Sequence, residues 1–236
     1  MKLTSTLPKR GFTLLETVIA IGVLAVLLTG FMVVFAPAAD GIRKSINVQQ
    51  ADRLASTLEQ ELVTLHDTKY KTGFDKSFEW IKGSNTAGEA LLVYQYRGKM
   101  DDLRADDRTP KPQVLLKDKL PGKDYVVVTM MRRKSDPKFT EDLAAIEGQV
   151  YAVKCTQLIF SNGQLVTGKA GSISDPKGAG GAVSSTTDYP EAVIAFAADF
   201  HMMPASAPSF FTGAAFTSKF NAVKNPVFSR NIAVRR

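Results

Sequence analysis

An apolar run near the start of the chain constrains what the rest of it can be. From Phe12 to Ala36 there are 25 residues, of which sixteen are Leu, Ile, Val, Phe or Met and only Glu16 is charged. A helix of that length reaches roughly 38 Å, enough to cross a hydrocarbon core of about 30 Å with some tilt. The insertion free energies of its apolar side chains together outweigh the cost of one carboxylate near the end of the span. The run therefore predicts a helix that enters a bilayer.

The residues around the start of this run carry further signals. Lys2, Lys9 and Arg10 precede it, so the positive-inside rule places the N-terminus in the cytoplasm. A small residue, Gly11, stands between the basic pair and the run. Glu16 lies five positions into the run, where a charge is costly and usually marks function.

The stretch Lys9-Arg10-Gly11-Phe12-Thr13-Leu14-Leu15-Glu16 closely resembles the processing and assembly motif of type IV prepilins and type II secretion pseudopilins, over about residues 9–37. The resemblance implies that a prepilin peptidase cuts between Gly11 and Phe12 and that the new amine of Phe12 is methylated. It also implies that Glu16 helps to recruit and register each subunit in a filament. A carboxylate in apolar surroundings needs a cationic partner, and the amine of Phe12 on a neighbouring subunit could supply one.

Two other interpretations of the run stay open. It could be a plain anchor with Glu16 at the level of the headgroups. It could also be a secretory signal peptide, since Ala36-Pro37-Ala38 looks like a cleavage site, although the run exceeds the usual apolar core of about 7–15 residues. The mature N-terminal residue distinguishes these cases: Phe12 for a pilin, Ala39 for a signal peptide and Met1 for an unprocessed anchor.

After Pro37 the helical pattern becomes amphipathic. Its apolar positions recur mostly every four residues: Ile42, Ile46, Leu54, Leu58, Leu62 and Leu65. We expect one helix over about residues 12–66, kinked near Pro37 or Gly41, after a leader of residues 1–11. Residues 12–36 would lie in the bilayer and residues 37–66 would pack on a globular head of residues 67–236.

The sequence of the head predicts a series of β-strands. Residues 69–88 predict a connector with a short helical turn, and residues 98–112 and 168–188 predict loops, the second of them exposed and mobile. The predicted strands are Ala90–Tyr96, Asp124–Met131, Gln149–Phe160, Gln164–Thr167, Glu191–His201 and Val227–Val234, with Asn162-Gly163 as a hairpin turn and a Pro/Ala/Phe stretch at Pro204–Phe216. One long helix followed by such strands indicates the α+β class with an antiparallel sheet, which the pilin resemblance also implies.

The net charge bears on the possible binding partners, and the cysteine content bears on possible disulfides. Loss of the leader, with its three cations, would lower the formal net charge from +7 to +4, so the positive charge is partly a signal of membrane topology. The charge that remains favours anionic partners only mildly, and we expect no nucleic acid partner. The single cysteine, Cys155, excludes a disulfide within the chain, whereas many pilins carry one near the C-terminus. Cys155 lies in an apolar strand-like run and is predicted to be buried.

The sequence offers few candidates for a catalytic, metal-binding or phosphate-binding site. His66 and His201 have no cysteine or carboxylate at a metal-binding spacing. Gly163–Lys169 matches the start of a phosphate-binding loop, but Ala170 replaces the hydroxyl residue that would hold magnesium. The weak calcium candidates are Asp101, Asp102, Asp106 and Asp107. Their spacing fits no established calcium loop, and Arg104 and Arg108 would neutralise their charges. We therefore expect a solvated loop. The short basic runs Arg132–Lys134 and Arg235–Arg236 are expected to be solvated strand ends.

The sequence thus predicts a structural subunit, a pilin or minor pseudopilin of a type IV pilus or type II secretion filament, and no enzyme or cofactor. Its expected partners are the prepilin peptidase, other pilin subunits and the assembly platform of the inner membrane. The chain would first be a single-pass protein of that membrane with its head outside the cytoplasm, and later part of a periplasmic or cell-surface filament. The alternative is a membrane-tethered binding module that does not polymerise.

Overall fold

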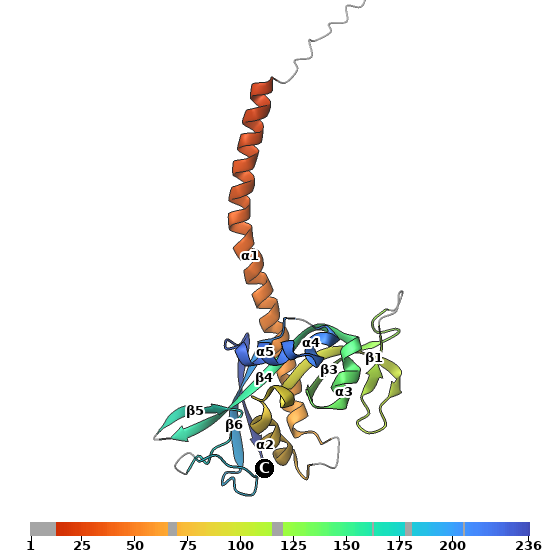
Figure 1. Ribbon diagram of the computed structural model, residues 1–236, viewed down its shortest axis with the longest axis vertical. Coiled ribbons are helices and arrows are strands. Elements are labelled where there is room, and N and C mark those ends of the chain that lie inside the picture. The colour runs from red at the N-terminus through yellow and green to blue at the C-terminus, as the bar shows by residue number, and fades with distance from the viewer. Residues whose placement is uncertain (1–12, 66–69, 115–119, 162, 178–180, 205) are drawn as a thin grey trace, which may run out of the picture. The chain divides into compact units, whose positions relative to one another are not determined.

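The computed structural model describes residues 13–65, 70–114, 120–161, 163–177, 181–204 and 206–236 (Figure 1). The chain divides into two compact units, Met1–Ile46 and Asn47–Arg236. Helix α1, Leu14–Val63, begins in the first unit and ends in the second. The remaining helices are α2 (Gly73–Gly83), η1 (Ala87–Glu89), α3 (Pro137–Asp142), η2 (Leu143–Ala145), α4 (Pro208–Thr212) and α5 (Ala214–Ala222). The strands are β1 (Leu91–Leu103), β2 (Pro110–Pro112), β3 (Val126–Arg133), β4 (Ile146–Ser161), β5 (Gln164–Ala170), β6 (Val193–Met202) and β7 (Phe228–Arg235).

The seven strands form one sheet in which every pairing is antiparallel. The order is β2-β1-β4-β6-β7, with β3 also paired to β1 and β5 to β4. The long strand β4 therefore has β1 and then β5 along one edge, and β6 along the other. This confirms the α+β class with an antiparallel sheet.

One face of the sheet packs on the second part of α1 and on α2. Ala51, Leu54, Ala55, Leu58 and Leu62 of α1 are all buried against the sheet, as the four-residue spacing predicts. Ile42 and Ile46, which continue the same stripe toward the N-terminus, are 62% and 55% exposed in the first unit. Pro37 lies inside α1, and the predicted kink stays a prediction.

The C-terminal end of α1 is closed by α2. The last carbonyls of a helix have no partner within it and need donors from elsewhere. Ser77 donates to the carbonyl of Leu62 at 2.8 Å, and Lys76 donates to the carbonyl of Thr64 at 2.7 Å. α2 begins after its N-cap Thr72, whose hydroxyl accepts a hydrogen bond from the N–H of Asp75 at 3.1 Å. Gly73 fits the close approach to α1, because a Cβ there would lie 2.7 Å from the carbonyl oxygen of Val63. The predicted helical turn is thus a full helix of eleven residues.

The opposite face of the sheet packs on α3, α4 and α5. Leu92, Tyr94 and Ala152 on the strands contact an aromatic group formed by Phe139, Phe211, Phe216 and Phe220. Neighbouring rings of this group lie 5.5–5.6 Å apart, in the range of favourable aromatic pairs. The sheet is therefore covered on both faces in this half of the head, and α4 and α5 occupy the Pro204–Phe216 stretch to which the sequence assigned no structure.

Two predicted loops are wrong in part. Strand β1 runs on to Leu103 and pairs with β2 inside the region predicted as the loop 98–112. Gly98 allows this pairing because a Cβ there would lie 2.6 Å from Pro110. In the segment 168–188, Ile173 is 1% exposed and belongs to the core, so this part of the segment is packed and not exposed. Residues 178–180 lie outside the described residues.

Candidate functional site

Three of the four aspartates that the sequence offers as calcium ligands, Asp102, Asp106 and Asp107, face cations of the protein itself. Asp102 lies 2.7 Å from Lys111, and a hydrogen bond from that ammonium holds the pKa of Asp102 below its usual range. Asp106 pairs with Lys138. Asp101 is exposed at the end of β1. Among the described residues no group of three or more His, Cys, Asp or Glu side chains is placed to hold a metal ion. Calcium at this loop would have to displace these lysines.

The fourth aspartate belongs to a buried ion cluster, which we call the Asp142 cluster: Tyr94, Arg104, Asp107, Arg132 and Asp142. The Asp142 carboxylate is fully buried and accepts hydrogen bonds from Tyr94 at 2.6 Å, Arg104 at 2.8 Å and Arg132 at 3.2 Å. Arg132 also donates to Asp107 at 3.2 Å. The prediction of a solvated loop and a solvated Arg132 is wrong here, because opposite charges from distant segments pair and can be buried together.

The electrostatics of the cluster follow from this pairing. Burial alone would raise the pKa of Asp107, but hydrogen bonds from Lys138 and Thr109 and the charge of Arg132 outweigh it and hold this pKa well below its usual value. Burial raises the pKa of Tyr94 well above its usual value, and the negative charge of Asp142 adds to the effect. Asp107 therefore stays ionised and Tyr94 stays protonated over the physiological range. The cluster ties β1, β3, α3 and the turn after β1 together.

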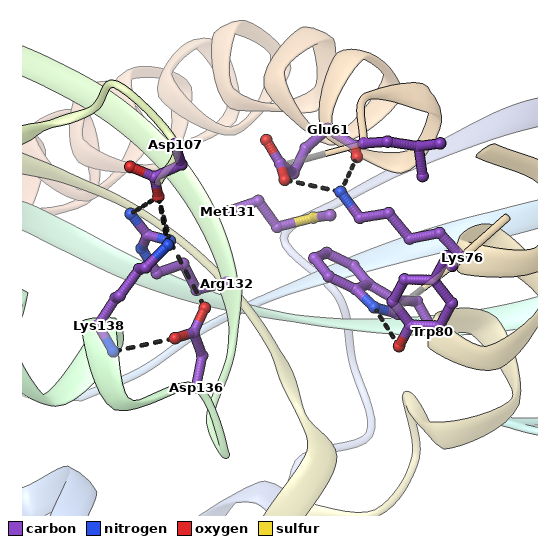
Figure 2. A pocket seen from close by; sticks show the side chains of 10 residues that line it. Glu61, Lys76, Trp80, Asp107, Met131, Arg132, Asp136 and Lys138 are labelled. Atoms are coloured by element: carbon purple, nitrogen blue, oxygen red, sulfur yellow. Dashed lines mark hydrogen bonds and ion pairs between the residues drawn. The ribbon is translucent and has the colours of Figure 1, made fainter. Parts of the chain in front are cut away.

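A cleft lies between this cluster and the end of α1. Figure 2 shows Asp107, Arg132, Asp136 and Lys138 on one side, Glu61, Lys76 and Trp80 on the other, and Met131 between them. Lys76 is 2.8 Å from the Glu61 carboxylate and 4.4 Å from the centre of the Trp80 ring. The indole of Trp80 donates to the hydroxyl of Tyr70 at 3.3 Å. These ion pairs lie within each wall of the cleft: Arg132 and Lys138 pair with Asp107 on one side, and Lys76 pairs with Glu61 on the other. The cleft is therefore lined by structural ion pairs.

The other sequence candidates have structural roles. Cys155 is fully buried, and burial raises the pKa of its thiol to about 12, which confirms that it acts as a small core residue. His201 is buried with Nδ1 3.3 Å from the carbonyl of Asn225, and burial lowers its pKa. Gly163–Lys169 forms the turn and strand of a hairpin and not a loop before a helix, so it cannot cradle a phosphate as a phosphate-binding loop does. His66 lies outside the described residues.

At the N-terminal end of α1, the first turn is closed by Thr13 and Glu16. The backbone N–H and the hydroxyl of Thr13 both donate to Glu16 Oε2 at 2.9 Å, and the N–H of Glu16 donates to the Thr13 hydroxyl at 3.2 Å. This reciprocal arrangement is a capping box, and a carboxylate is also favoured at the positive end of the helix dipole. The spacing Thr-x-x-Glu was visible in the sequence and was the signal that could have predicted this cap.

Beyond this first turn, the large apolar side chains of α1 up to Phe35 are exposed. The described part of the chain has one helix long and apolar enough to cross a membrane, α1, whose apolar window has a mean hydropathy of 2.8 and none of its residues buried. Lys9, Arg10, Gly11 and Phe12, which the sequence assigns to the leader and the cleavage site, lie outside the described residues.

Comparison with known proteins identifies this end of the chain. Residues 7–32 match the family described as the prokaryotic N-terminal methylation motif. The chain carries a prepilin-type signal. No curated protein and no solved structure matches it.

The prepilin-type signal identifies the class of the N-terminal segment. The matched residues include the capping pair Thr13 and Glu16 and most of the apolar part of α1. The signal and the exposed apolar helix together fit a membrane-anchored, pilin-type precursor. Proteins with this signal are structural and not enzymatic as a family.

Proposed function

We propose that the chain is the precursor of a filament subunit, a pilin or minor pseudopilin of a type IV pilus or a type II secretion system. The observation that carries this proposal is the prepilin-type signal at the start of a helix whose first 22 described residues, Leu14–Phe35, expose their large apolar side chains. Such a helix is stable in lipid, and it is equally stable in a bundle of like helices that keeps the same side chains out of water.

In this proposal, the prepilin peptidase removes residues 1–11, and the amine of Phe12 is methylated. Residues 12–36 hold the precursor in the inner membrane, and the head lies outside the cytoplasm. The assembly platform then moves α1 from lipid into the filament. The large head, whose loops include the ion-paired turn after β1, favours a minor or specialised subunit over the major one.

The capping box gives Glu16 a defined state before assembly. In the separate chain, its carboxylate accepts both hydrogen bonds from Thr13. A cationic donor adds a Coulomb attraction to the carboxylate that the neutral donors of Thr13 lack, and this attraction is strong where water is excluded. An amine from Phe12 of a neighbouring subunit would therefore compete well with Thr13 for this carboxylate, and the exchange would favour subunits at the correct register.

Variants of the capping pair test the proposal. Glu16→Ala should insert into the membrane normally and fail to enter filaments, because the charge that pairs with the neighbouring amine is gone. Thr13→Ala removes the two hydrogen bonds of the Thr13 hydroxyl but keeps the charge of Glu16, so it should still assemble. Filaments sheared from cells and probed for the subunit report the difference. Normal function of Glu16→Ala would instead favour the membrane-tethered binding module.

A further inference from the structure

The far end of the β4–β5 ribbon exposes large apolar side chains to solvent. Phe160, Leu165 and Val166 are 70%, 61% and 48% exposed. Figure 1 shows β5 and the end of β4 leaving the rest of the sheet as a two-stranded ribbon. Exposed apolar side chains that are grouped on one projecting element mark an interaction site far more often than single ones do.

Both faces of this ribbon are apolar. Phe160 lies directly opposite Leu165, and Ile159 lies directly opposite Val166. Direct cross-strand partners share a face, and successive residues of a strand point to opposite faces. One face therefore carries Phe160 and Leu165, and the other carries Ile159 and Val166. A folded partner protein would need only one such face, whereas an apolar medium that surrounds the ribbon accommodates both.

One exposed cation at the base of the ribbon complements an anionic surface. The sequence from Cys155 to Gly168 contains no charged residue, and a lysine flanks it on each side. Lys154 donates to the carbonyl of Val223 and lies 4.6 Å from the centre of the Phe220 ring, whereas Lys169 is exposed on β5. An uncharged apolar tip with an exposed cation behind it is typical of segments that enter the interface of a bilayer containing anionic lipids.

The depth of such a contact has a physical limit. Strand β5 has β4 as its only strand partner within the described part of the chain, so its outer edge still needs hydrogen bonds. An open sheet edge does not occur in the hydrocarbon core, where water is absent. The headgroup region, which extends about 5–10 Å to the acyl boundary, offers both water and apolar surroundings.

We propose that the ribbon tip, made of the side chains of Ile159, Phe160, Leu165 and Val166, inserts into the interfacial layer of the membrane, with Lys169 facing anionic headgroups. This inference rests on the proposed function in one respect. An anchor in the same membrane holds the head at a high effective concentration near the surface, so that four apolar side chains are enough. The head then has a contact with lipid that must be released when the subunit enters a filament.

Spin labels on the full chain test this contact. The chain is reconstituted in vesicles of phosphatidylethanolamine and phosphatidylglycerol, with a nitroxide on Phe160→Cys or on Leu165→Cys. Leu103→Cys and Val127→Cys are matched controls, because these apolar side chains are 46% and 44% exposed on other strands of the head. Cys155 is fully buried, so the label attaches to the introduced thiol, and the unsubstituted chain gives the background. Oxygen, which concentrates in lipid, and a polar nickel chelate, which lipid excludes, report the surroundings of each label.

The labels at Phe160 and Leu165 should be several-fold more accessible to oxygen than to nickel, and the two control labels should show the reverse. Lys169→Glu should move the label at Phe160 toward water in these vesicles and have little effect in vesicles of phosphatidylcholine alone. Labels at Phe160 and Leu165 that resemble the controls would overturn the proposal. So would labels shielded from both reagents and broadened by a neighbouring nitroxide, which would indicate pairing of two copies.

Flotation of the vesicles separates the two proposals: a chain that does not float overturns both, and a chain that floats with its tip in water overturns only the ribbon contact.

Discussion

The ammonium of Lys76 lies 2.8 Å from the carboxylate of Glu61 and also donates to the main-chain carbonyl of that residue. A single lysine of α2 thus neutralises an acid in the last turns of α1 and supplies a donor to carbonyls that the helix leaves without partners. Both side chains are largely buried, at 5% and 13% exposed. The junction between the end of α1 and α2 therefore combines this buried ion pair with the hydrogen bond from Ser77 to the Leu62 carbonyl.

We expect Lys76→Met to lower the free energy of unfolding of the head by about 3 kcal/mol, because it leaves Glu61 largely buried without this ion pair. Urea unfolding of the full chain in detergent, followed by Trp80 fluorescence, measures the change. Lys99→Met removes an exposed lysine that pairs with Asp102, and it should leave the urea midpoint almost unchanged. Equal midpoints for the two variants would contradict the structural role of Lys76.

The Asp142 cluster offers a test on two neighbouring acids. Asp142→Asn should cost about 3–5 kcal/mol of stability, because it leaves the buried guanidinium groups of Arg104 and Arg132 without their shared carboxylate. Glu141→Gln removes an acid that also pairs with Arg104, at 2.9 Å, but whose side chain is 58% exposed, so it should cost less than about 1 kcal/mol. The same urea unfolding experiment measures both. A large effect of Glu141→Gln with a small one of Asp142→Asn would show that burial does not decide the strength of these pairs.

Acid should weaken the head through Asp107. Its pKa is lower in the folded chain than in the unfolded one, so the unfolded state binds more protons in acid. The stabilisation is complete above the ordinary carboxyl pKa of about 4 and is lost as the pH falls through the lower pKa of the folded state. Asp107→Asn should therefore be less stable at neutral pH and show a flatter loss of stability from about pH 5 downward. Asp101→Asn removes an equal charge from an exposed position and should retain the wild-type slope.

Cys155 should be inert in the folded protein. Its thiol is fully buried, and burial raises its pKa to about 12, so almost no reactive thiolate is present at neutral pH. A maleimide should label the native Phe160→Cys variant completely without denaturant. In the same time, it should label Cys155 of the wild-type chain only if denaturant is added. Rapid labelling of the native wild-type chain would show that β4 opens or that the thiol is not in the core.

Local signals in the sequence predicted much of this fold. The four-residue spacing of Leu54, Leu58 and Leu62 predicted the buried side of α1, and Asn162-Gly163 predicted the β4–β5 hairpin. These features depend on residues that are close in sequence, where helix periodicity and turn preference act directly. The Thr13–Glu16 cap is also a local feature, and the Thr-x-x-Glu spacing alone could have predicted it.

Other features depend on distant partners and were out of reach. Arg104, Arg132 and Asp142 each look like solvated charges in the sequence, and only the sheet and α3 bring them together. The charges after Gly98 concealed the second half of β1, because an exposed strand end tolerates them as well as a loop does. Phe216 and Phe220 are four residues apart and stack on one side of α5, but this one spacing was too short a pattern to predict a helix.

Processing of the N-terminus is tested by intact mass and N-terminal sequencing of the protein from cells that express a prepilin peptidase. We expect a chain that starts at Phe12, carries one extra methyl group on its amine, and becomes full length again when Gly11 is replaced by a bulky residue. A mature chain that starts at Ala39, or one that keeps Met1 in the presence of the peptidase, would contradict this expectation.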